Sequence, residues 1–91
     1  MSITITRHAG PLDLVRIRAC DERSTIAMAL EVNLSQFGGD RYWQIAVIRS
    51  APGLLEPVTY PRIDDERDAE TWIRYLAELV LRAEQAEAVT Q

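Results

Sequence analysis

Residues 64–89, DDERDAETWIRYLAELVLRAEQAEAV, form the stretch of this sequence that decides the fold. At about 100° per residue, its apolar side chains occupy an arc of roughly 200°, wider than the stripe of about 100° that one packing surface requires. Asp64 or Asp65 can cap the start of a helix, and more acidic residues follow in the first turn. The stretch therefore predicts one long C-terminal helix that covers a sheet and has more apolar surface than one packing contact can bury.

Four segments before this helix alternate apolar and polar side chains, as strands with one buried face do. They cover residues 2–8, 12–20, 25–34 and 41–49. Prolines between residues 50 and 63 restrict Val58-Thr59-Tyr60 to a short fifth edge strand at most. We expect an α+β fold: residues 1–91 form a single β4α domain, a four-stranded antiparallel β-meander with the helix packed on one face.

The turn lengths also predict a register for the four strands. With the apolar residues on one face, the expected cross-strand pairs are Ile5 with Val15, Ile17 with Met28, and Leu30 with Ile45. Arg7 then faces Asp13 as a cross-strand ion pair. The buried side of the third strand is expected to consist of Ile26, Met28, Leu30, Val32 and Leu34.

The sheet face turned away from the helix is the candidate recognition surface. In the expected register this face carries Ala27, Ala29 and Glu31. Arg16 and Arg18 are therefore expected beside small, partly apolar side chains. One explanation is structural: Arg16 reaches diagonally to Glu31 and the alanines are merely tolerated. The other is a docking face, because Arg and Tyr are favoured interface anchors. The expected partner-binding residues are Arg16, Arg18, Tyr42, Gln44 and Ile48.

The wide apolar arc of the helix indicates self-association. Tyr75 lies on this arc, and Leu81 is expected at the edge of the polar helical face, next to Glu70 and Arg74. A single exposed leucine is ordinary on a protein surface. Together with the wide arc, however, Tyr75 and Leu81 are the expected contacts of a homodimer.

Few residues in the chain could support enzymatic chemistry. His8 and Cys20 are the only candidates for a Cys–His pair, and the expected register separates them by roughly 26 Å, far beyond hydrogen-bond reach. No Cys/His set could bind zinc, and the acidic residues at the helix start lack the ligand spacing of a calcium loop. We expect no catalytic residue, no metal and no cofactor. A pocket near Tyr60 and Trp72 is a third hypothesis, from a different class.

The net charge of −4 argues against broad binding to phosphate backbones. A lone cysteine suits a reducing cytoplasm, and no segment is long and apolar enough to span a bilayer. The first hypothesis is therefore a small cytoplasmic, non-enzymatic protein that binds another protein as an accessory factor, inhibitor or immunity-type module. The β4α order is similar in outline to small dimeric single-strand-binding coactivators and Whirly-type folds, in topology alone. The likeness supports a single-stranded nucleic-acid-binding dimer as the alternative.

Overall fold

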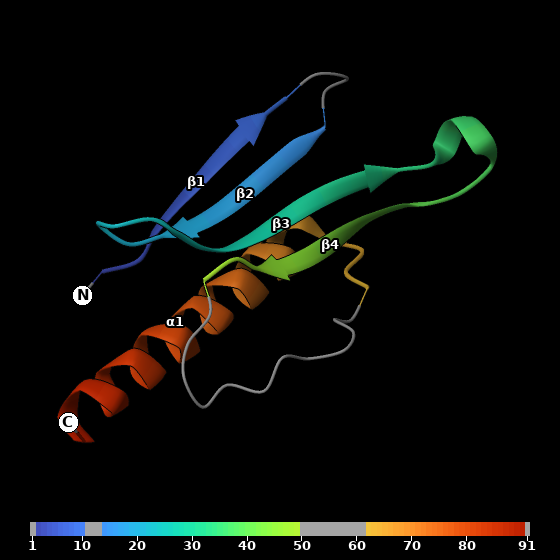
Figure 1. Ribbon diagram of the computed structural model, residues 1–91. Helices are drawn as coiled ribbons and strands as arrows, with labels where there is room; N and C mark the ends of the chain where they lie inside the picture. The colour runs from blue at the N-terminus through green and yellow to red at the C-terminus, as the bar shows by residue number, and fades with distance from the viewer. Residues whose placement is uncertain (1, 11–13, 50–61, 91) are drawn as a thin grey trace.

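The computed structural model describes residues 2–10, 14–49 and 62–90, and it confirms the α+β fold. Four strands form one antiparallel sheet in the order β1-β2-β3-β4, and the helix α1 (Glu66–Thr90) packs on one face of it (Figure 1). The strands are β1 (Thr4–Ala9), β2 (Val15–Cys20), β3 (Thr25–Asn33) and β4 (Arg41–Val47). The sheet is therefore the expected meander with a long C-terminal helix.

The core lies between α1 and the sheet, and most of its residues are those that were expected to face the helix. It combines buried residues of β2, β3, β4 and α1, and the half-buried Ile3 and Ile5 pack against it. The buried apolar residues of the sheet are Val15, Ile17, Ala19, Ile26, Ala27, Ala29, Trp43 and Ile45, and those of α1 are Ala69, Ile73, Ala77, Val80 and Leu81. On α1 these positions recur every three to four residues, which is the spacing of a single packed helical stripe.

Ile26 is buried as expected, but from Ala27 onward the faces of β3 are the reverse of the prediction. Ile17 lies opposite Ala29, not Met28, and Ile45 also lies opposite Ala29 while Leu30 lies opposite Gln44. Both neighbours of β3 are thus displaced by one residue, and a one-residue displacement exchanges the two faces of a strand. Ala27 and Ala29 face the helix, whereas Met28 and its apolar neighbours on alternate positions face away.

A bulge at the start of β3 explains the error. Cys20 pairs with Thr25, but Ala19 pairs with Ala27, so Ile26 is the extra residue between two cross-strand pairs. Its side chain is fully buried, and its carbonyl oxygen accepts hydrogen bonds from the backbone N–H groups of Ile48 (2.8 Å) and Arg49 (3.2 Å). A bulge changes the face on which all later residues of the strand lie. The alternating pattern from Ile26 onward could not reveal this change.

The pairing of β1 with β2 also differs from the expected register, though not in its faces. Ile5 lies opposite Ala19, not Val15. Arg7 donates to Glu66 at the start of α1, from Nε to Oε1 over 2.9 Å. The expected partner of Arg7, Asp13, lies outside the described residues.

The two edges of the sheet differ. At the β4 edge, Trp43 and Ile63 exchange backbone hydrogen bonds of 2.6 and 3.3 Å in an isolated bridge. The expected fifth strand, Val58-Thr59-Tyr60, lies outside the described residues. At the β1 edge, the part of the chain that the structure describes supplies no further strand.

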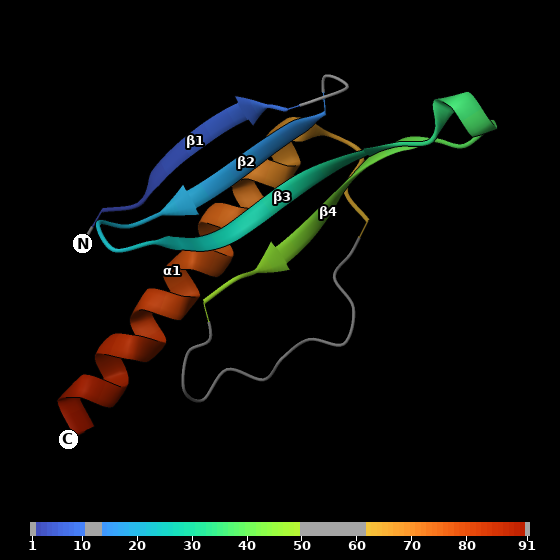
Figure 2. The same cartoon turned by 45° about the horizontal axis from the view of Figure 1, so that its top comes forward.

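The hairpin that joins β3 to β4 extends beyond the body of the molecule as an arm (Figure 2). A short 3₁₀ helix, η2 (Ser35–Phe37), forms its tip. Gly38 has a φ of 75°, a left-handed conformation that ends this turn. A Cβ atom on Gly39 would lie 2.7 Å from the Cβ of Leu34, so the chain can close here only with glycine.

Candidate functional site

The sheet face turned away from α1, here called the open face, contains a row of apolar side chains along β3. Met28, Leu30 and Val32 are half-buried on this face and run down its middle. The fully buried Ala27 and Ala29 occupy the intervening positions on the helix side. An antiparallel sheet with one solvated face normally presents polar residues there. β3 instead has apolar residues on both faces, which is typical of a strand that meets a second surface.

Four of the five expected partner-binding residues flank this apolar row. Across the strands, Arg16 lies beside Leu30 and then Gln44, while Arg18 lies beside Met28 and then Ala46. Tyr42 is the neighbour of Val32. The arginines therefore stand next to large apolar side chains, where the predicted register placed alanines.

Ile48 lies apart from that group. It follows the end of β4, is 52% exposed, and its backbone N–H donates to the bulged residue Ile26. Ala46, and not Ile48, is the β4 residue in the row that contains Arg18.

The expected diagonal pair between Arg16 and Glu31 is also wrong. Glu31 lies on the helix side of β3, is 6% exposed, and pairs with Arg41. Its other carboxylate oxygen accepts a hydrogen bond of 3.4 Å from the backbone N–H of Val15. Arg41 and this N–H compensate the buried charge of the carboxylate, which would otherwise be costly.

The charge of the open face is consequently of one sign. Neither Arg16 nor Arg18 forms an ion pair within the residues that the structure describes. The strand register places no carboxylate of β1–β4 on this face. Two arginines beside an apolar row, in a chain with a net charge of −4, make this the basic surface of an acidic protein.

The aromatic ring at the edge of the open face already has a partner. The guanidinium carbon of Arg62 lies 4.2 Å from the centroid of the Tyr42 ring, a cation–π contact. Arg62 also pairs with Asp40, at 3.4 Å. These contacts orient the Tyr42 ring and bring a third arginine next to the open face.

The arm adds an exposed aromatic residue that the sequence pattern did not single out as a site. Phe37 at its tip is 84% exposed, and Leu34 at the base of the 3₁₀ turn is 41% exposed. Leu34 follows the last residue of β3, so the arm carries exposed apolar side chains at both its base and its tip. The only signal in the sequence was a phenylalanine next to a glycine pair, which equally fits a simple turn.

The structure does not bring the two expected dimer residues together. Leu81 is 6% exposed and belongs to the core, so its expected position at the edge of a polar face is wrong. Tyr75 is 54% exposed. They are six positions apart, which places them about 120° apart around a helix of 3.6 residues per turn. Tyr75 shares its side of α1 with Trp72, which is 37% exposed.

A half-buried ion pair joins the β2–β3 turn to the residues that follow β4. Arg49 holds the carboxylate of Asp21 with two hydrogen bonds, from Nη1 to Oδ2 (2.8 Å) and from Nη2 to Oδ1 (2.7 Å). The backbone N–H groups of Arg23 and Ser24 also donate to Asp21 Oδ1. The hydrogen bonds from Arg49 hold the pKa of Asp21 well below its ordinary value of 3.8. On α1, Glu84 lies 3.6 Å from Arg49 and 2.8 Å from Arg23.

This cluster has a structural role. Every oxygen of Asp21 is engaged by a donor, and the contacts connect the β2–β3 turn to the end of β4 and to α1. Asp21 and Arg49 are 28 positions apart in the sequence, so their pairing could be found only from the fold.

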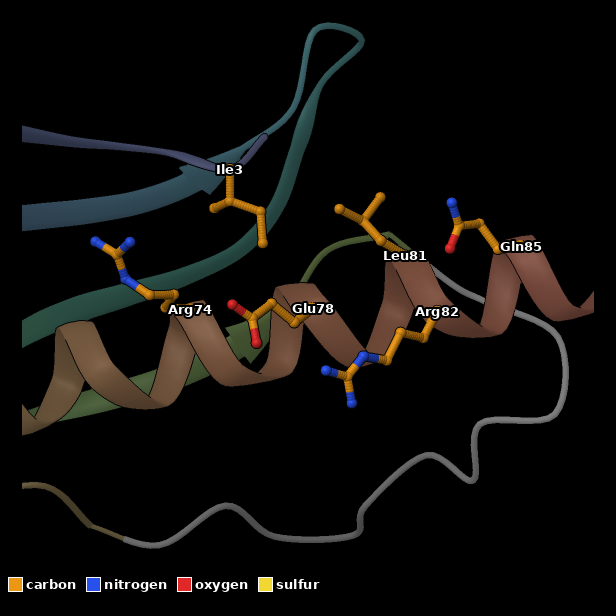
Figure 3. A pocket seen from close by; sticks show the side chains of 6 residues that line it. All are labelled: Ile3, Arg74, Glu78, Leu81, Arg82 and Gln85. Atoms are coloured by element: carbon orange, nitrogen blue, oxygen red, sulfur yellow. The ribbon is translucent and has the colours of Figure 1, made fainter. Parts of the chain in front are cut away.

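A hollow of about 260 Å³ lies under the start of β1, next to the flank of α1 (Figure 3). Ile3 reaches toward it from the sheet and Leu81 from the helix, and charged or polar side chains of α1 complete its lining. These side chains are Arg74, Glu78, Arg82 and Gln85. The expected pocket near Trp72 depended on Tyr60, which lies outside the described residues.

The residues considered for catalysis remain apart. His8 lies opposite Arg16 and Cys20 opposite Thr4, so the two side chains are four strand positions apart, roughly 13 Å. The expected separation was twice as large, because the β1–β2 register differs. The Cys20 sulfur instead lies 3.6 Å from the Thr25 hydroxyl. Within residues 2–10, 14–49 and 62–90, no cluster of His, Cys, Asp and Glu side chains has the geometry to hold a metal ion.

No helix in the described part of the chain combines the length and the apolar character needed to cross a membrane. Comparison with curated proteins gives no match, and comparison with solved structures gives none either. One family model does match, that of the domain of unknown function DUF7214, and it covers residues 1–91. The chain therefore belongs to the DUF7214 family.

Proposed function

We propose that this protein is a small, non-enzymatic, cytoplasmic module that binds another protein through the open face of its sheet. It would act as an accessory factor, an inhibitor or an immunity-type protein. The observation that supports this proposal best is the row of Met28, Leu30 and Val32 on the face away from the core. Three large apolar side chains on the solvent side of a central strand favour burial against a partner.

The residues around the row indicate the chemistry of that partner. Arg16 and Arg18 lie along one side of it, and Tyr42 and Gln44 along the other. A complementary surface offers apolar side chains to β3 and carboxylates to the two arginines. Arg is suited to this role because its planar guanidinium binds a carboxylate through two parallel hydrogen bonds. The partner is therefore expected to be an acidic surface with an apolar centre.

The test is an affinity capture from the source cell followed by mass spectrometry, with matched variants of the bait. Arg18→Glu should lose the specific partner because it places a carboxylate against carboxylates. Arg67→Glu, an exposed arginine in the first turn of α1, makes the same change of charge away from the open face and should keep the partner. Leu30→Ser should lose the partner without a change of net charge.

Purified partner then gives the affinity of each variant by calorimetry. Loss of a central anchor is expected to weaken binding by about 2 kcal/mol or more, which is the usual scale for an interface hot spot. Equal affinities for the protein and for its Arg18→Glu and Leu30→Ser variants would remove the open face from consideration as the binding site.

Binding of single-stranded nucleic acid is the alternative function. The stack of Arg62 on Tyr42, with Arg16 and Arg18 on the same sheet, resembles the combination of cations and rings that holds unpaired bases. The Tyr42 ring is already in contact with Arg62, however, and the middle of the face is aliphatic, so a protein partner is favoured. A fluorescently labelled oligonucleotide in dilute salt separates the two, since the alternative requires salt-dependent binding.

A further inference from the structure

We propose that two copies of this chain pair through their β1 strands, so that the two sheets form one continuous eight-stranded sheet with both helices on the same side. This inference is independent of the open-face proposal, because it concerns the edge of the sheet and not its face. It also replaces the contact through Tyr75 and Leu81 that the sequence predicted.

The first argument is the state of the two sheet edges. The β4 edge exchanges hydrogen bonds with Ile63, whereas no described residue pairs with the outer side of β1. Proteins usually protect a free edge with proline, lysine, a bulge or an inward-pointing charge. β1 has the sequence TITRHA, without proline or lysine, and it pairs with β2 without a register shift. Its one charge on the helix side, Arg7, is compensated by Glu66 of α1. An edge strand whose inward charge is compensated remains a template for another strand.

The backbone geometry identifies the groups that a new strand would bind. Gly10 donates its N–H to the carbonyl of Leu14 across the β1–β2 hairpin. Hydrogen-bonded and non-hydrogen-bonded pairs alternate along an antiparallel ladder. Counting back from Gly10, the N–H and C=O groups of Ile5, Arg7 and Ala9 therefore point outward, away from β2.

These outward groups restrict how two β1 strands can pair across a twofold axis. An axis at Arg7 would place two arginines directly opposite each other, which is unfavourable. An axis at Thr6 pairs Ile5 with the partner's Arg7 and Thr4 with the partner's His8, and it keeps the arginines apart. We therefore place Thr6 on the axis, as a non-hydrogen-bonded pair with the Thr6 of the second copy.

The second argument is the apolar hollow next to this edge. Ile3 and Ile5 are half-buried on the helix side of β1, and Ile3 and Leu81 line the hollow of about 260 Å³ between β1 and α1 (Figure 3). β1 is thus the strand whose inner face α1 covers least, since it contributes no fully buried residue to the core. The second β1 strand would lie next to this incomplete part of the core.

A stack of two open faces is the competing way to form a dimer, and it brings like charges together. The open face presents Arg16 and Arg18 without a carboxylate from the four strands. Two such faces would bring four guanidinium groups together without counter-charges. The second copy is therefore expected at the β1 edge, which leaves both open faces accessible on one side of the joined sheet.

Cysteine cross-linking of the full chain tests the register. In a Cys20→Ser background, Thr6→Cys places two thiols opposite each other in a non-hydrogen-bonded pair, where Cα atoms lie about 4.5 Å apart. The matched variant Thr4→Cys is also exposed on β1, but its two copies would lie roughly 13 Å apart, too far for a disulfide.

The expected result is a dimeric mass for the protein by light scattering, and a Thr6→Cys dimer that forms at least about tenfold faster than the Thr4→Cys dimer under mild oxidation. A monomeric mass at high protein concentration would overturn the proposal. A dimeric protein in which both variants cross-link equally slowly would overturn it as well, and would direct attention to the Tyr75 side of α1.

Discussion

Two neighbouring residues of β3 should respond to substitution in opposite ways, because the bulge at Ile26 assigns them to different faces. Ala29 is fully buried where α1 packs against the sheet, whereas Leu30 is half-exposed on the open face. Ala29→Leu inserts three carbon atoms into a filled core, which typically costs about 1–3 kcal/mol. Leu30→Ala removes a side chain that is only half-buried.

The expected cost of Leu30→Ala follows from its exposure. Full burial of a leucine side chain contributes about 1.5–3 kcal/mol, so a half-buried side chain contributes about 1 kcal/mol. A leucine in the core would instead cost about 2–5 kcal/mol when it is replaced by alanine. Total stabilities of about 5–15 kcal/mol leave room to measure both changes.

Urea unfolding followed by circular dichroism provides the measurement, with equal m-values as the check that both variants unfold from the same compact state. Ala29→Leu should be the more destabilised of the two. If Leu30→Ala cost more than about 2 kcal/mol while Ala29→Leu were neutral, the faces of β3 would be as the alternating sequence pattern suggested, and the open-face proposal would fail.

Two further results are expected elsewhere in the fold. Asp21 has a pKa below 3.8 in the folded state because Arg49 holds its charged form, so its contribution to stability is complete above about pH 5 and is lost as the pH falls below that value. Asp21→Asn should therefore be less stable than the parent protein at pH 7, and the difference should narrow in urea titrations repeated toward pH 2; a difference independent of pH would contradict the ion pair. Gly39→Ala should lower the urea midpoint of unfolding more than Gly38→Ala does. A Cβ atom at Gly39 would lie 2.7 Å from Leu34, whereas Gly38 has open space around it and only its φ of 75° opposes the substitution. The opposite order would show that backbone conformation, and not side-chain contact, limits substitution at the tip of the arm.

The order and type of the elements could be predicted from the sequence, because they depend on local patterns. Three strands present the expected residues to α1, and the helix begins where its acidic residues indicated, at Glu66. The alternation in β2 and β4 is sufficient because one of their faces is clearly the more polar.

The faces of β3 could not be predicted, because alternation gives the period of a strand but not its register. The row of Met28, Leu30 and Val32 is more hydrophobic than Ala27 and Ala29, so hydrophobicity alone assigns it to the core. The helix lies close to β3, however, and the small Ala27 and Ala29 are the ones buried there. Where local hydrophobicity and the observed fold disagree in this way, a functional surface is a common reason.

The candidate site was predicted in part for the same reason. Arg16, Arg18, Tyr42 and Gln44 lie on strands whose faces were correctly assigned, so they share one surface. The apolar row between them was missed, because it belongs to β3. Leu81 was misplaced because the buried side of α1 is turned toward it. The orientation of that side depends on the angle at which α1 crosses the sheet, which the sequence does not show.

Oxidation of Met28 by hydrogen peroxide is the most direct test of the central claim, that the large apolar residues of β3 lie outside the core. Methionine becomes its sulfoxide where the sulfur meets solvent, and peptide mapping by mass spectrometry gives the rate at this residue in native protein and in urea. Because Met28 is half-exposed, its sulfur should oxidise in the native protein at a rate of the same order as in the unfolded chain. Protection of Met28 until the protein unfolds would place it beneath α1 and contradict the account.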